Sequence, residues 1–422
     1  MAIDRLLIGN FKGIGAAQSI DIKPLTIFVG GNSTGKSTCI HALACLSQTV
    51  KVTNNTRPLI LDDEFASVHL GRFIEVIHSR SYQDVISLGV TIKRMPFTVF
   101  APKDGKGRQQ AVSAQATASA EYAFKCTLRT QDIHLTEARI AVGDHQFTAK
   151  KDKQGYLVTK DRDGTRCRFA VETAFLLGEA SSSYDNPEDY MAFYPLRQFQ
   201  ARLKRELSNT LYLGPFRQAP RRKYPTRGSS PSEVGAMGES TVTLLANEIV
   251  QTQTRTHIAQ IAHWLSDLGL AKTLAVTRLA QSDIFDVSLT LQDGEEFPLA
   301  DLGYGVSQVL PVLTQCSFAK PGTTLLFEQP EIHLHTIAAR RLARVFIQTF
   351  QKKGCHVVVE THSPELVKQV FCEIREGSLS VGDVVIYKVT REDFHTQVRP
   401  IAIEGTGCDI DVYDNWEQGI SM

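Results

Sequence analysis

The 422-residue chain is long enough for one large domain or for two to three domains of ordinary size. Its 46 Lys and Arg residues balance 45 Asp and Glu, so the net charge of +1 gives no overall attraction to nucleic acid, and such a contact requires a local patch. No run of about 18 apolar residues is present, so we expect no membrane contact and a cytoplasmic protein. The eight cysteines have no zinc spacing, which favours buried thiols.

Three short strands are predicted within residues 3–29, followed by a glycine-rich loop and a helix over 37–47. The loop has the spacing G-x-x-x-x-G-K-S, in which backbone N–H groups and a helix N-terminus bind phosphate oxygens. Lys36 is expected to reach the β- and γ-phosphates of a nucleotide, and the Ser37 hydroxyl to ligate Mg²⁺. The predicted nucleotide-binding residues of this loop are Gly30, Gly31, Asn32, Ser33, Thr34, Gly35, Lys36, Ser37 and Thr38.

The middle of the chain reads as a region of strands followed by helices. Residues 86–170 alternate between apolar and polar side chains, which predicts strands, and the polar stretch 103–120 is predicted to be a mobile loop. An Asp-Gly pair within 161–164 favours a tight hairpin turn. The other predicted elements are a linker at 179–186, helices at 187–209 and 239–269, and two strands within 272–292.

A basic loop over residues 217–227 lies within this middle region and carries interleaved aromatic residues. Its cations are Arg217, Arg221, Arg222, Lys223 and Arg227. Such a loop could contact DNA or RNA, close over nucleotide phosphates or a partner subunit, or be a solvated segment. The sequence leaves these three interpretations open.

The last part of the chain is predicted to be an α/β core with a parallel sheet. Strand 323–327, helix 336–352, strand 355–360 and helix 364–373 alternate. The first strand ends at Glu328, which is expected to hold Mg²⁺ through its water shell. The second ends near His362, which can hydrogen-bond a γ-phosphate or the attacking water.

A further glycine-containing segment, DLGYGVSQ, precedes an apolar helix over 309–318. Its Gly303, Gly305 and Ser307 form another helix start that can bind an anion. The long distance from the first loop to Glu328, together with the lack of an Asn-Lys-x-Asp element, disfavours a GTPase.

These motifs resemble those of ABC-type ATPases of the SMC, RecF and OLD group. The resemblance rests on LLIGNFKGIG, IDIKPLTIFVGGNSTGKST, LGYGVSQVLPVL, FEQPEIHLHT and ETHSPELV. Two further segments, HLGRFIEVIH and YLGPFR with VGAMGE, are similar to those of stand-alone bacterial and archaeal AAA-type ATPases. Members of that set often work in anti-phage defence or DNA-linked modules beside an effector protein.

The resemblance implies an α/β fold: a split P-loop ABC-type ATPase head with an inserted β-rich and helical region. The implied domains are an N-terminal ATPase lobe at 1–85, a β-rich insertion at 86–178, a helical and basic-loop insertion at 179–298, and a C-terminal ATPase lobe at 299–422. It also implies a head-to-head homodimer, with higher oligomers left open, in which Gly303, Gly305 and Ser307 contact the γ-phosphate in trans. The family often has a serine where this chain has Gly303, so Ser307 would supply the hydroxyl.

One departure from the family pattern affects the expected rate. The usual Asp-Glu pair is replaced by Glu328 and Gln329, and an amide cannot act as a general base. Hydrolysis is therefore expected to be slow. Glu331 faces the same side as Gln329 in an extended segment and is a candidate base; the alternative is a cap of the following helix. The two-residue spacing of His333 and His335 raises a metal site as a lesser alternative to a place at the dimer seam.

The predicted function is a slow ATPase that uses ATP and Mg²⁺, with an ATP-dependent dimer that senses or regulates a separate effector in antiviral defence or DNA processing. The alternative is a non-hydrolysing, ATP-bound scaffold for a partner toxin or nuclease. An OLD-type nuclease is disfavoured because only about fifty residues follow position 373, too few for a Toprim-like domain. The β-rich insertion and the acidic segment 404–417 are candidate docking surfaces.

Overall fold

The structure is a computed structural model that divides the chain into two compact units. It describes residues 3–52, 57–100, 111–152, 155–161, 164–173, 175–180, 191–226, 230–252, 254–280 and 282–403. Unit 1 consists of Met1–Ile22, His41–Thr210 and Arg391–Val398, and unit 2 of Lys23–Ile40, Leu211–Thr390 and Arg399–Met422. The four domains inferred from motifs stay a prediction. No helix among the described residues is long and apolar enough to cross a membrane.

Unit 1 is built on an antiparallel sheet with the strand order β10-β9-β8-β7-β6-β5-β4-β1-β2. The strands are β1 Arg5–Gly9, β2 Gln18–Asp21, β4 Ile86–Phe100, β5 Ala111–Cys126, β6 Ile133–Val142, β7 His145–Asp152, β8 Gly155–Lys160, β9 Arg166–Thr173 and β10 Leu176–Ala180. Strands β4 to β10 follow one another in the sheet as in the chain, which antiparallel hairpins permit.

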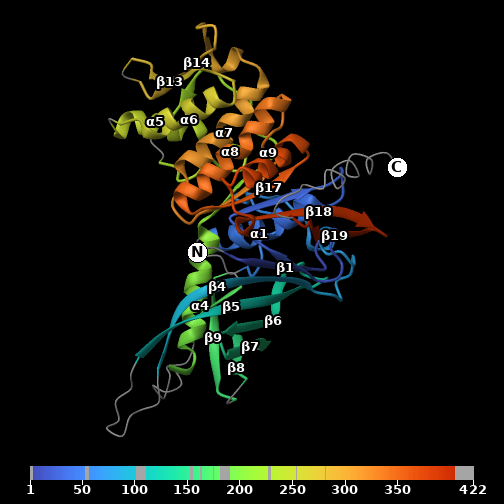
Figure 1. The fold of residues 1–422 in the computed structure, drawn as a ribbon. Coiled ribbons are helices and arrows are strands. Elements are labelled where there is room, and N and C mark those ends of the chain that lie inside the picture. Colours follow the sequence, from blue (N-terminus) through green and yellow to red (C-terminus); the bar gives the residue numbers. More distant parts are fainter. Residues whose placement is uncertain are drawn as a thin grey trace. The chain divides into compact units, whose positions relative to one another are not determined.

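One face of this sheet packs against helix α4 (Tyr194–Ser208), which runs along it in Figure 1. The ring of Phe193, just before the helix, contacts those of Phe147 and Phe169 at centroid distances of 5.8 and 5.7 Å. These three rings are completely buried. The alternation seen in the sequence thus places aromatic side chains between sheet and helix.

The mobile loop predicted at 103–120 is wrong for residues 111–120, which belong to β5. Ala111 to Ala120 pair with β4 from Phe100 to Val90. Their small and polar side chains gave no strand signal, because a paired, solvent-facing strand is stabilised by its ladder rather than by propensity. Residues 101–110 lie outside the described part, as do 181–186 of the predicted linker and the acidic segment 404–417.

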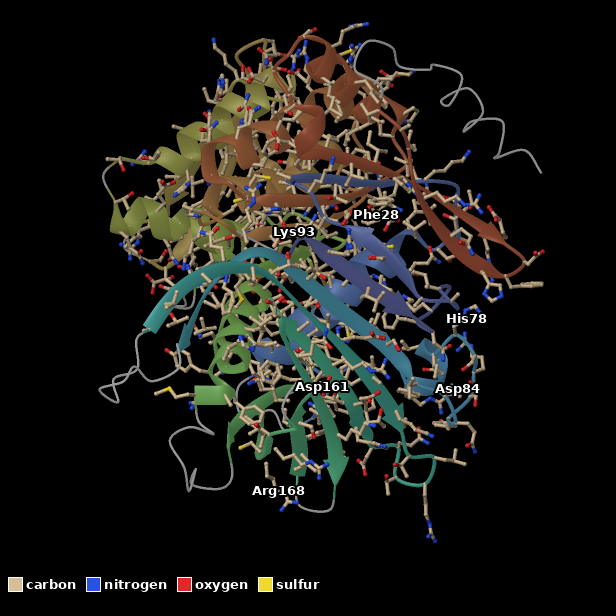
Figure 2. All side chains as sticks on the ribbon, turned by 60° about the horizontal axis from the view of Figure 1, so that its bottom comes forward. Phe28, His78, Asp84, Lys93, Asp161 and Arg168 are labelled. Atoms are coloured by element: carbon tan, nitrogen blue, oxygen red, sulfur yellow. The ribbon has the colours of Figure 1, made fainter. Side chains whose placement is uncertain are left out.

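The hairpin predicted around residues 161–164 joins β8 to β9. The Thr165 carbonyl accepts from the Lys160 N–H at 2.8 Å, and Gly164 has a φ of +69°, which a glycine adopts without strain. Figure 2 labels Asp161, which follows β8, and Arg168, which lies on β9.

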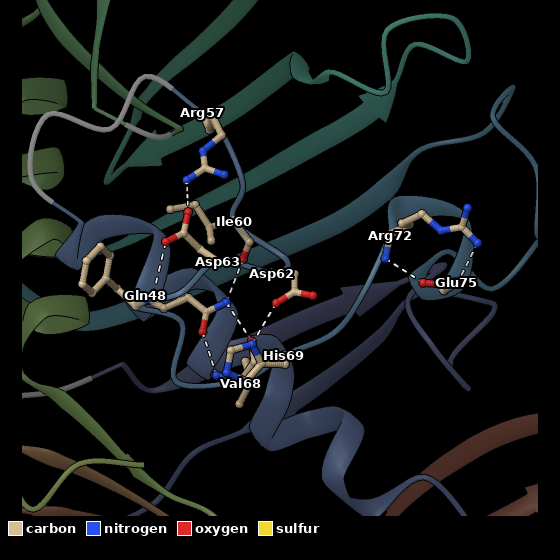
Figure 3. Close-up of polar contacts among 10 residues, drawn as sticks. Gln48, Arg57, Ile60, Asp62, Asp63, Val68, His69, Arg72 and Glu75 are labelled. Atoms are coloured by element: carbon tan, nitrogen blue, oxygen red, sulfur yellow. Dashed lines mark hydrogen bonds and ion pairs between the residues drawn. The ribbon is translucent and has the colours of Figure 1, made fainter. Parts of the chain in front are cut away.

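Helix α1 (Lys36–Lys51) begins in unit 2 and continues into unit 1, where Gln48 fixes the following segment. The Gln48 amide donates to Ile60 O at 2.8 Å and accepts from Val68 N at 2.9 Å (Figure 3). Nearby, the His69 ring and the Asp62 carboxylate lie 2.8 Å apart. A buried amide with both ends bonded therefore holds the chain that leads to the short helix α2 (Phe73–Val76).

Most of a second, mainly parallel sheet with the order β11-β16-β17-β3-β18-β19 belongs to unit 2. The strands are β3 Leu25–Val29, β11 Thr210–Leu213, β16 Thr324–Glu328, β17 His356–Thr361, β18 Val384–Glu392 and β19 His395–Pro400. Strands β16, β17, β3 and β18 are parallel, and every residue of β3 and β16 is buried. Continuous apolar runs are typical of such strands.

Helices of unit 2 join or cover these strands. They are α7 Tyr304–Phe318, α8 Thr336–Lys353 and α9 Pro364–Arg375. A smaller sheet of β12 Tyr224–Pro225, β13 Thr273–Arg278, β14 Ile284–Thr290 and β15 Glu296–Pro298 packs with α5 Thr241–Gln251 and α6 Thr256–Asp267. The predicted α/β fold, with strands and helices alternating after residue 323, is confirmed.

Candidate nucleotide-binding site

The glycine-rich loop leaves the buried end of β3 and enters α1. Gly30 has a φ of +155°, and a side-chain carbon there would lie 2.2 Å from Val389 O, so only glycine fits. Gly35 has a φ of +99°, and the Thr34 hydroxyl donates to Gly31 O at 3.0 Å across the loop. Two glycines and one internal hydrogen bond thus set a tight loop at the helix start, as phosphate binding requires.

The Lys36 side chain folds back into this loop. Only 3% of Lys36 is exposed, and its ammonium donates to Gly31 O at 2.7 Å and Gly30 O at 3.1 Å. Burial lowers the pKa of Lys36, while the carboxylates of Glu360 and Glu331 act in the opposite direction. The structure therefore places the predicted phosphate-binding cation inside the loop, with negative side chains near it.

Two carboxylates lie opposite each other at the carboxyl ends of neighbouring strands. Glu328 of β16 pairs in register with Glu360 of β17, and both are buried. The Tyr212 hydroxyl of β11 donates to Glu328 Oε1 at 2.8 Å, and burial beside Glu328 raises the pKa of Tyr212. Glu328 is thus held at the sheet edge from which the glycine-rich loop starts.

Glu360 belongs to this site although the sequence analysis assigned it no role. It is 3% exposed, and burial together with the Glu328 carboxylate raises its pKa to about 7. A hydrogen bond from Ser37 and the charge of Lys36 offset this only in part. Its Oε2 atom is buried and accepts no hydrogen bond from the described residues. The rule that parallel strands end at one edge of a sheet could have identified it.

Glu331 lies against the end of β17 rather than at the start of α8. Its Oε1 atom accepts from the Thr361 hydroxyl at 2.6 Å and from His362 N at 3.0 Å. Its Oε2 atom is buried with no partner among the described residues, and burial raises its pKa. The cap of α8 is instead His335, whose ring accepts from Ile337 N at 3.3 Å. Of the two interpretations of Glu331, the helix cap therefore does not apply.

Gln329 and His362 complete this edge of the sheet. Gln329 has a left-handed φ of +44°, and its N–H donates to Glu360 O at 2.9 Å. His362 is half-buried, and burial, with the charge of Lys36, lowers its pKa. A neutral imidazole at neutral pH follows, which can both donate and accept a hydrogen bond.

The segment from Gly303 to Ser307 forms the start of α7. Gly303 is the N-cap and is open to solvent, whereas a side chain at Gly305 would meet His333 O at 2.7 Å. Ser307 is buried and its hydroxyl donates to Tyr304 O at 3.0 Å, so it is not presented at the surface. The His333 ring lies 5.9 Å from that of Tyr304. Within the described residues no group of three or more His, Cys, Asp or Glu side chains is placed to hold a metal.

Arg217, placed in a basic loop by the sequence analysis, is buried in unit 2. Its guanidinium donates to Glu328 O at 2.9 Å, Gln308 O at 3.2 Å and Gln329 O at 3.3 Å. Burial lowers its pKa to about 10, against the opposing effect of nearby Glu331, Tyr212 and Glu328. Arg217 therefore joins α7 to the end of β16 and does not face nucleic acid.

The rest of the basic loop is partly neutralised. Arg222 forms two contacts with the Asp301 carboxylate, at 2.6 and 3.0 Å, and the Arg221 N–H donates to the Tyr224 hydroxyl at 2.8 Å. Arg227 lies outside the residues that the structure describes.

Replacing Arg217 with methionine is expected to lower the melting temperature of the protein by several degrees. The change removes three hydrogen bonds that a buried guanidinium donates to carbonyls, a loss of about 2–4 kcal/mol, and 1 kcal/mol shifts the midpoint by about 2–4 °C for a unit of this size. Arg222→Met is the matched control, because that ion pair is exposed and contributes under about 1 kcal/mol. Equal melting of the two variants would contradict this role. Differential scanning fluorimetry measures both.

The residues present fit a nucleoside triphosphate with Mg²⁺. Gly30 and Gly35 have the positive φ angles of a tight loop at a helix start, Lys36 supplies a cation inside the loop, and the buried Oε2 of Glu360 accepts no hydrogen bond from the described residues, so a hydrated ion could supply the donor. Ser37 and Glu328 are the residues that would hold the ion.

Two family models match the chain. The model described as "AAA domain, putative AbiEii toxin, Type IV TA system" matches residues 148–368, and the AAA ATPase domain model matches residues 1–163. None of the curated proteins compared with the chain matches it.

Several solved structures are similar to the chain. The SMC head domain from Thermotoga maritima has 12% identity and a TM-score of 0.43, with 96% of this chain and 100% of that chain covered. An SmcHead bound to the C-winged helix domain of ScpA has 9% identity and a TM-score of 0.47, with 96% and 99% covered. The Smc head domain bound to the C-terminal domain of ScpA derived from Pyrococcus furiosus has 9% identity and a TM-score of 0.45, with 100% of both chains covered.

The family assignment rests on the first family model, which covers more than half of the chain. The AAA ATPase domain model adds the segment that contains the glycine-rich loop. The chain therefore belongs to the family described as AAA domain, putative AbiEii toxin, Type IV TA system, and it is an ATP-binding ATPase.

Proposed function

We propose that the protein is a slow, Mg²⁺-dependent ATPase whose ATP-bound form dimerises and regulates a separate effector. The observation that carries the proposal is the placement, within unit 2, of Lys36 in a phosphate-binding loop beside buried carboxylates, while Gln329 follows Glu328. The site has the cations and acids for nucleotide binding. The position at which the resemblance implies a glutamate base carries Gln329 instead.

In this proposal each side chain has a distinct role in hydrolysis. Lys36 and the loop amides bind phosphate oxygens, and Mg²⁺, when bound at Ser37 and Glu328, neutralises phosphate charge. Glu331 accepts the proton of the attacking water. His362 orients that water or a phosphate oxygen, which its neutral form allows. The products are ADP and phosphate.

The proposed slow rate predicts that Gln329→Glu accelerates phosphate release by about 10–100-fold, because a carboxylate replaces an amide that cannot accept a proton. The substitution keeps the same backbone conformation, since both side chains carry a Cβ at the left-handed position. Gln351→Glu, the same change at an exposed position of α8, is the control and leaves the rate unchanged. An unchanged rate in Gln329→Glu would mean that this amide does not limit hydrolysis. Phosphate release under saturating ATP is the measurement.

Exposed apolar side chains close to the site support the dimer. Phe216, Tyr304 and Ile337 are 80%, 63% and 56% exposed. Phe216 adjoins Arg217, Tyr304 begins α7, and Ile337 lies in the first turn of α8. Large apolar groups left in water favour an interface. The buried hydroxyl of Ser307 makes Gly303 and the α7 N-terminus the better candidates for a contact in trans.

Light scattering with and without ATP tests the dimer and separates it from the scaffold alternative. ATP-dependent doubling of the mass that reverses as phosphate is released supports the proposal. A dimer that retains ATP and releases no phosphate favours the non-hydrolysing scaffold. A monomer at saturating ATP would remove the dimer from the proposal.

The effector is proposed as a separate protein. The family description names a putative toxin of a type IV toxin–antitoxin system, which supports a role in a defence-related module. Nucleic-acid contact through residues 217–227 is not included, because Arg217 is buried and Arg222 is paired with Asp301. Identification of the protein that co-purifies with the intact chain tests this part.

A further inference from the structure

The buried carboxylate of Glu360 has no role in the function proposed above. It lies on β17 between β16 and β3, the strand that leads into the glycine-rich loop. In register, Glu360 faces Glu328 on one side and Phe28 on the other. A strand position so close to the loop normally carries an apolar side chain, because an unpaired buried charge is costly.

The two oxygens of the Glu360 carboxylate have different surroundings. Hydrogen bonding by the Ser37 hydroxyl lowers the pKa of the Glu360 carboxyl, so the two groups lie near each other. The second oxygen, Oε2, is buried and accepts nothing from the described residues. One side of the carboxylate is thus near the Ser37 hydroxyl, and Oε2 remains ready to accept from a donor that the described residues do not supply.

We propose that Glu360 is a positioning residue of the magnesium site. Glu360 holds the Ser37 hydroxyl so that the lone pairs of this hydroxyl face the ion. The Oε2 atom of Glu360 accepts hydrogen bonds from the water shell of the ion. A hydroxyl that ligates a cation must direct its proton elsewhere, and Glu360 receives that proton in a hydrogen bond. The opposing Glu328 carboxylate then acts on the same water shell from the neighbouring strand. The inference rests on the proposed ATPase function, because it assumes that Mg²⁺ is bound with ATP.

The same arrangement explains why two acids face each other inside the sheet. Adjacent strands are about 4.8 Å apart, so the two carboxylates repel each other unless a proton or cation lies near them. Lys36 supplies part of that positive charge. A divalent ion would supply more, so ion binding should be stronger with both acids than with one.

The test compares Glu360→Gln with the wild type by the Mg²⁺ dependence of binding of a fluorescent ATP analogue. Substitution of residues that orient metal ligands costs about 10–100-fold in metal affinity, so the half-saturating Mg²⁺ concentration should rise by about that factor. Binding of the analogue in EDTA should be unchanged, because Lys36 and the loop are intact. An unchanged half-saturating Mg²⁺ concentration would overturn the assignment.

A double-mutant cycle with Ser37→Ala tests whether Glu360 acts through the serine. If it does, Glu360→Gln adds less to the loss in the Ser37→Ala background than it causes alone. Full additivity would overturn the positioning role. Glu365→Gln, the same change five residues along at a site that contacts Lys368, is the matched control and leaves the Mg²⁺ dependence unchanged.

Folding and the proposed function are checked separately. Glu360→Gln is expected to melt no lower than the wild type, because it removes a charge from a buried position facing Glu328. If it does not fold, Glu360→Asp, which withdraws the carboxylate by one methylene, replaces it with the same expected rise. If Mg²⁺ does not raise the affinity of the wild type for the analogue, the proposed function itself fails. If Mg²⁺ does raise it, but the variants have the same half-saturating Mg²⁺ concentration as the wild type, only the assignment of Glu360 fails.

Discussion

Replacing Lys36 with alanine is expected to abolish ATP hydrolysis and to weaken ATP binding by at least about 100-fold. The ammonium is the cation enclosed by the loop, held by Gly30 O and Gly31 O. Hydrogen bonds to charged groups contribute about 1.5–3 kcal/mol each, and two such bonds to phosphate oxygens account for a loss of this size. Equilibrium binding of a fluorescent ATP analogue and continuous phosphate detection measure the two effects.

The control for this variant is Lys368→Ala. Lys368 is half exposed on α9 and contacts Glu365, so its removal changes the net charge equally without touching the loop. We expect normal binding and hydrolysis. If Lys36→Ala hydrolyses ATP at the rate of this control, then unit 2 does not use the loop as a phosphate site, and the proposed function is wrong.

The sequence was sufficient to predict those parts of the site that depend on local order. A strand, a glycine loop and a helix within about fifteen residues define a geometry that few alternatives share, and Gly30 and Gly35 take the backbone conformations that the motif requires. The predicted strands that end at Glu328 and near His362 are confirmed because buried parallel strands carry long apolar runs.

Contacts between distant segments were harder to predict. Tyr212 and Arg217 come from a segment far from Glu328 in the chain, and both meet it only through tertiary packing. A loop arginine reads as a surface cation, since sequence carries no direct signal that three carbonyls will surround it. The loop prediction for residues 111–120 was wrong for a related reason. Their pairing with β4 depends on two strands together and cannot be read from one of them.

Glu331→Gln is expected to lower the rate of ATP hydrolysis by about 10²–10⁴-fold, the usual cost of removing a general base. The amide has the same shape, and its oxygen can still accept from the Thr361 hydroxyl and His362 N. Burial raises the pKa of Glu331, so the wild-type rate should begin to fall on acidification at a higher pH than an exposed glutamate would give. Single-turnover phosphate release across a pH series measures both.

The same variant distinguishes the candidate base from a merely structural acid. If Glu331 takes the proton of the attacking water, Glu331→Gln binds ATP as tightly as the wild type and accumulates as the ATP-bound dimer, because only the chemical step is lost. If Glu331 instead only braces the end of β17, Glu331→Gln, which keeps the bonds to Thr361 and His362, should hydrolyse ATP at close to the wild-type rate. Retained rate with a normal melting temperature would exclude it as the base. The candidate would then be Glu360, a buried acid of the same strand ends whose Oε2 accepts no hydrogen bond from the described residues.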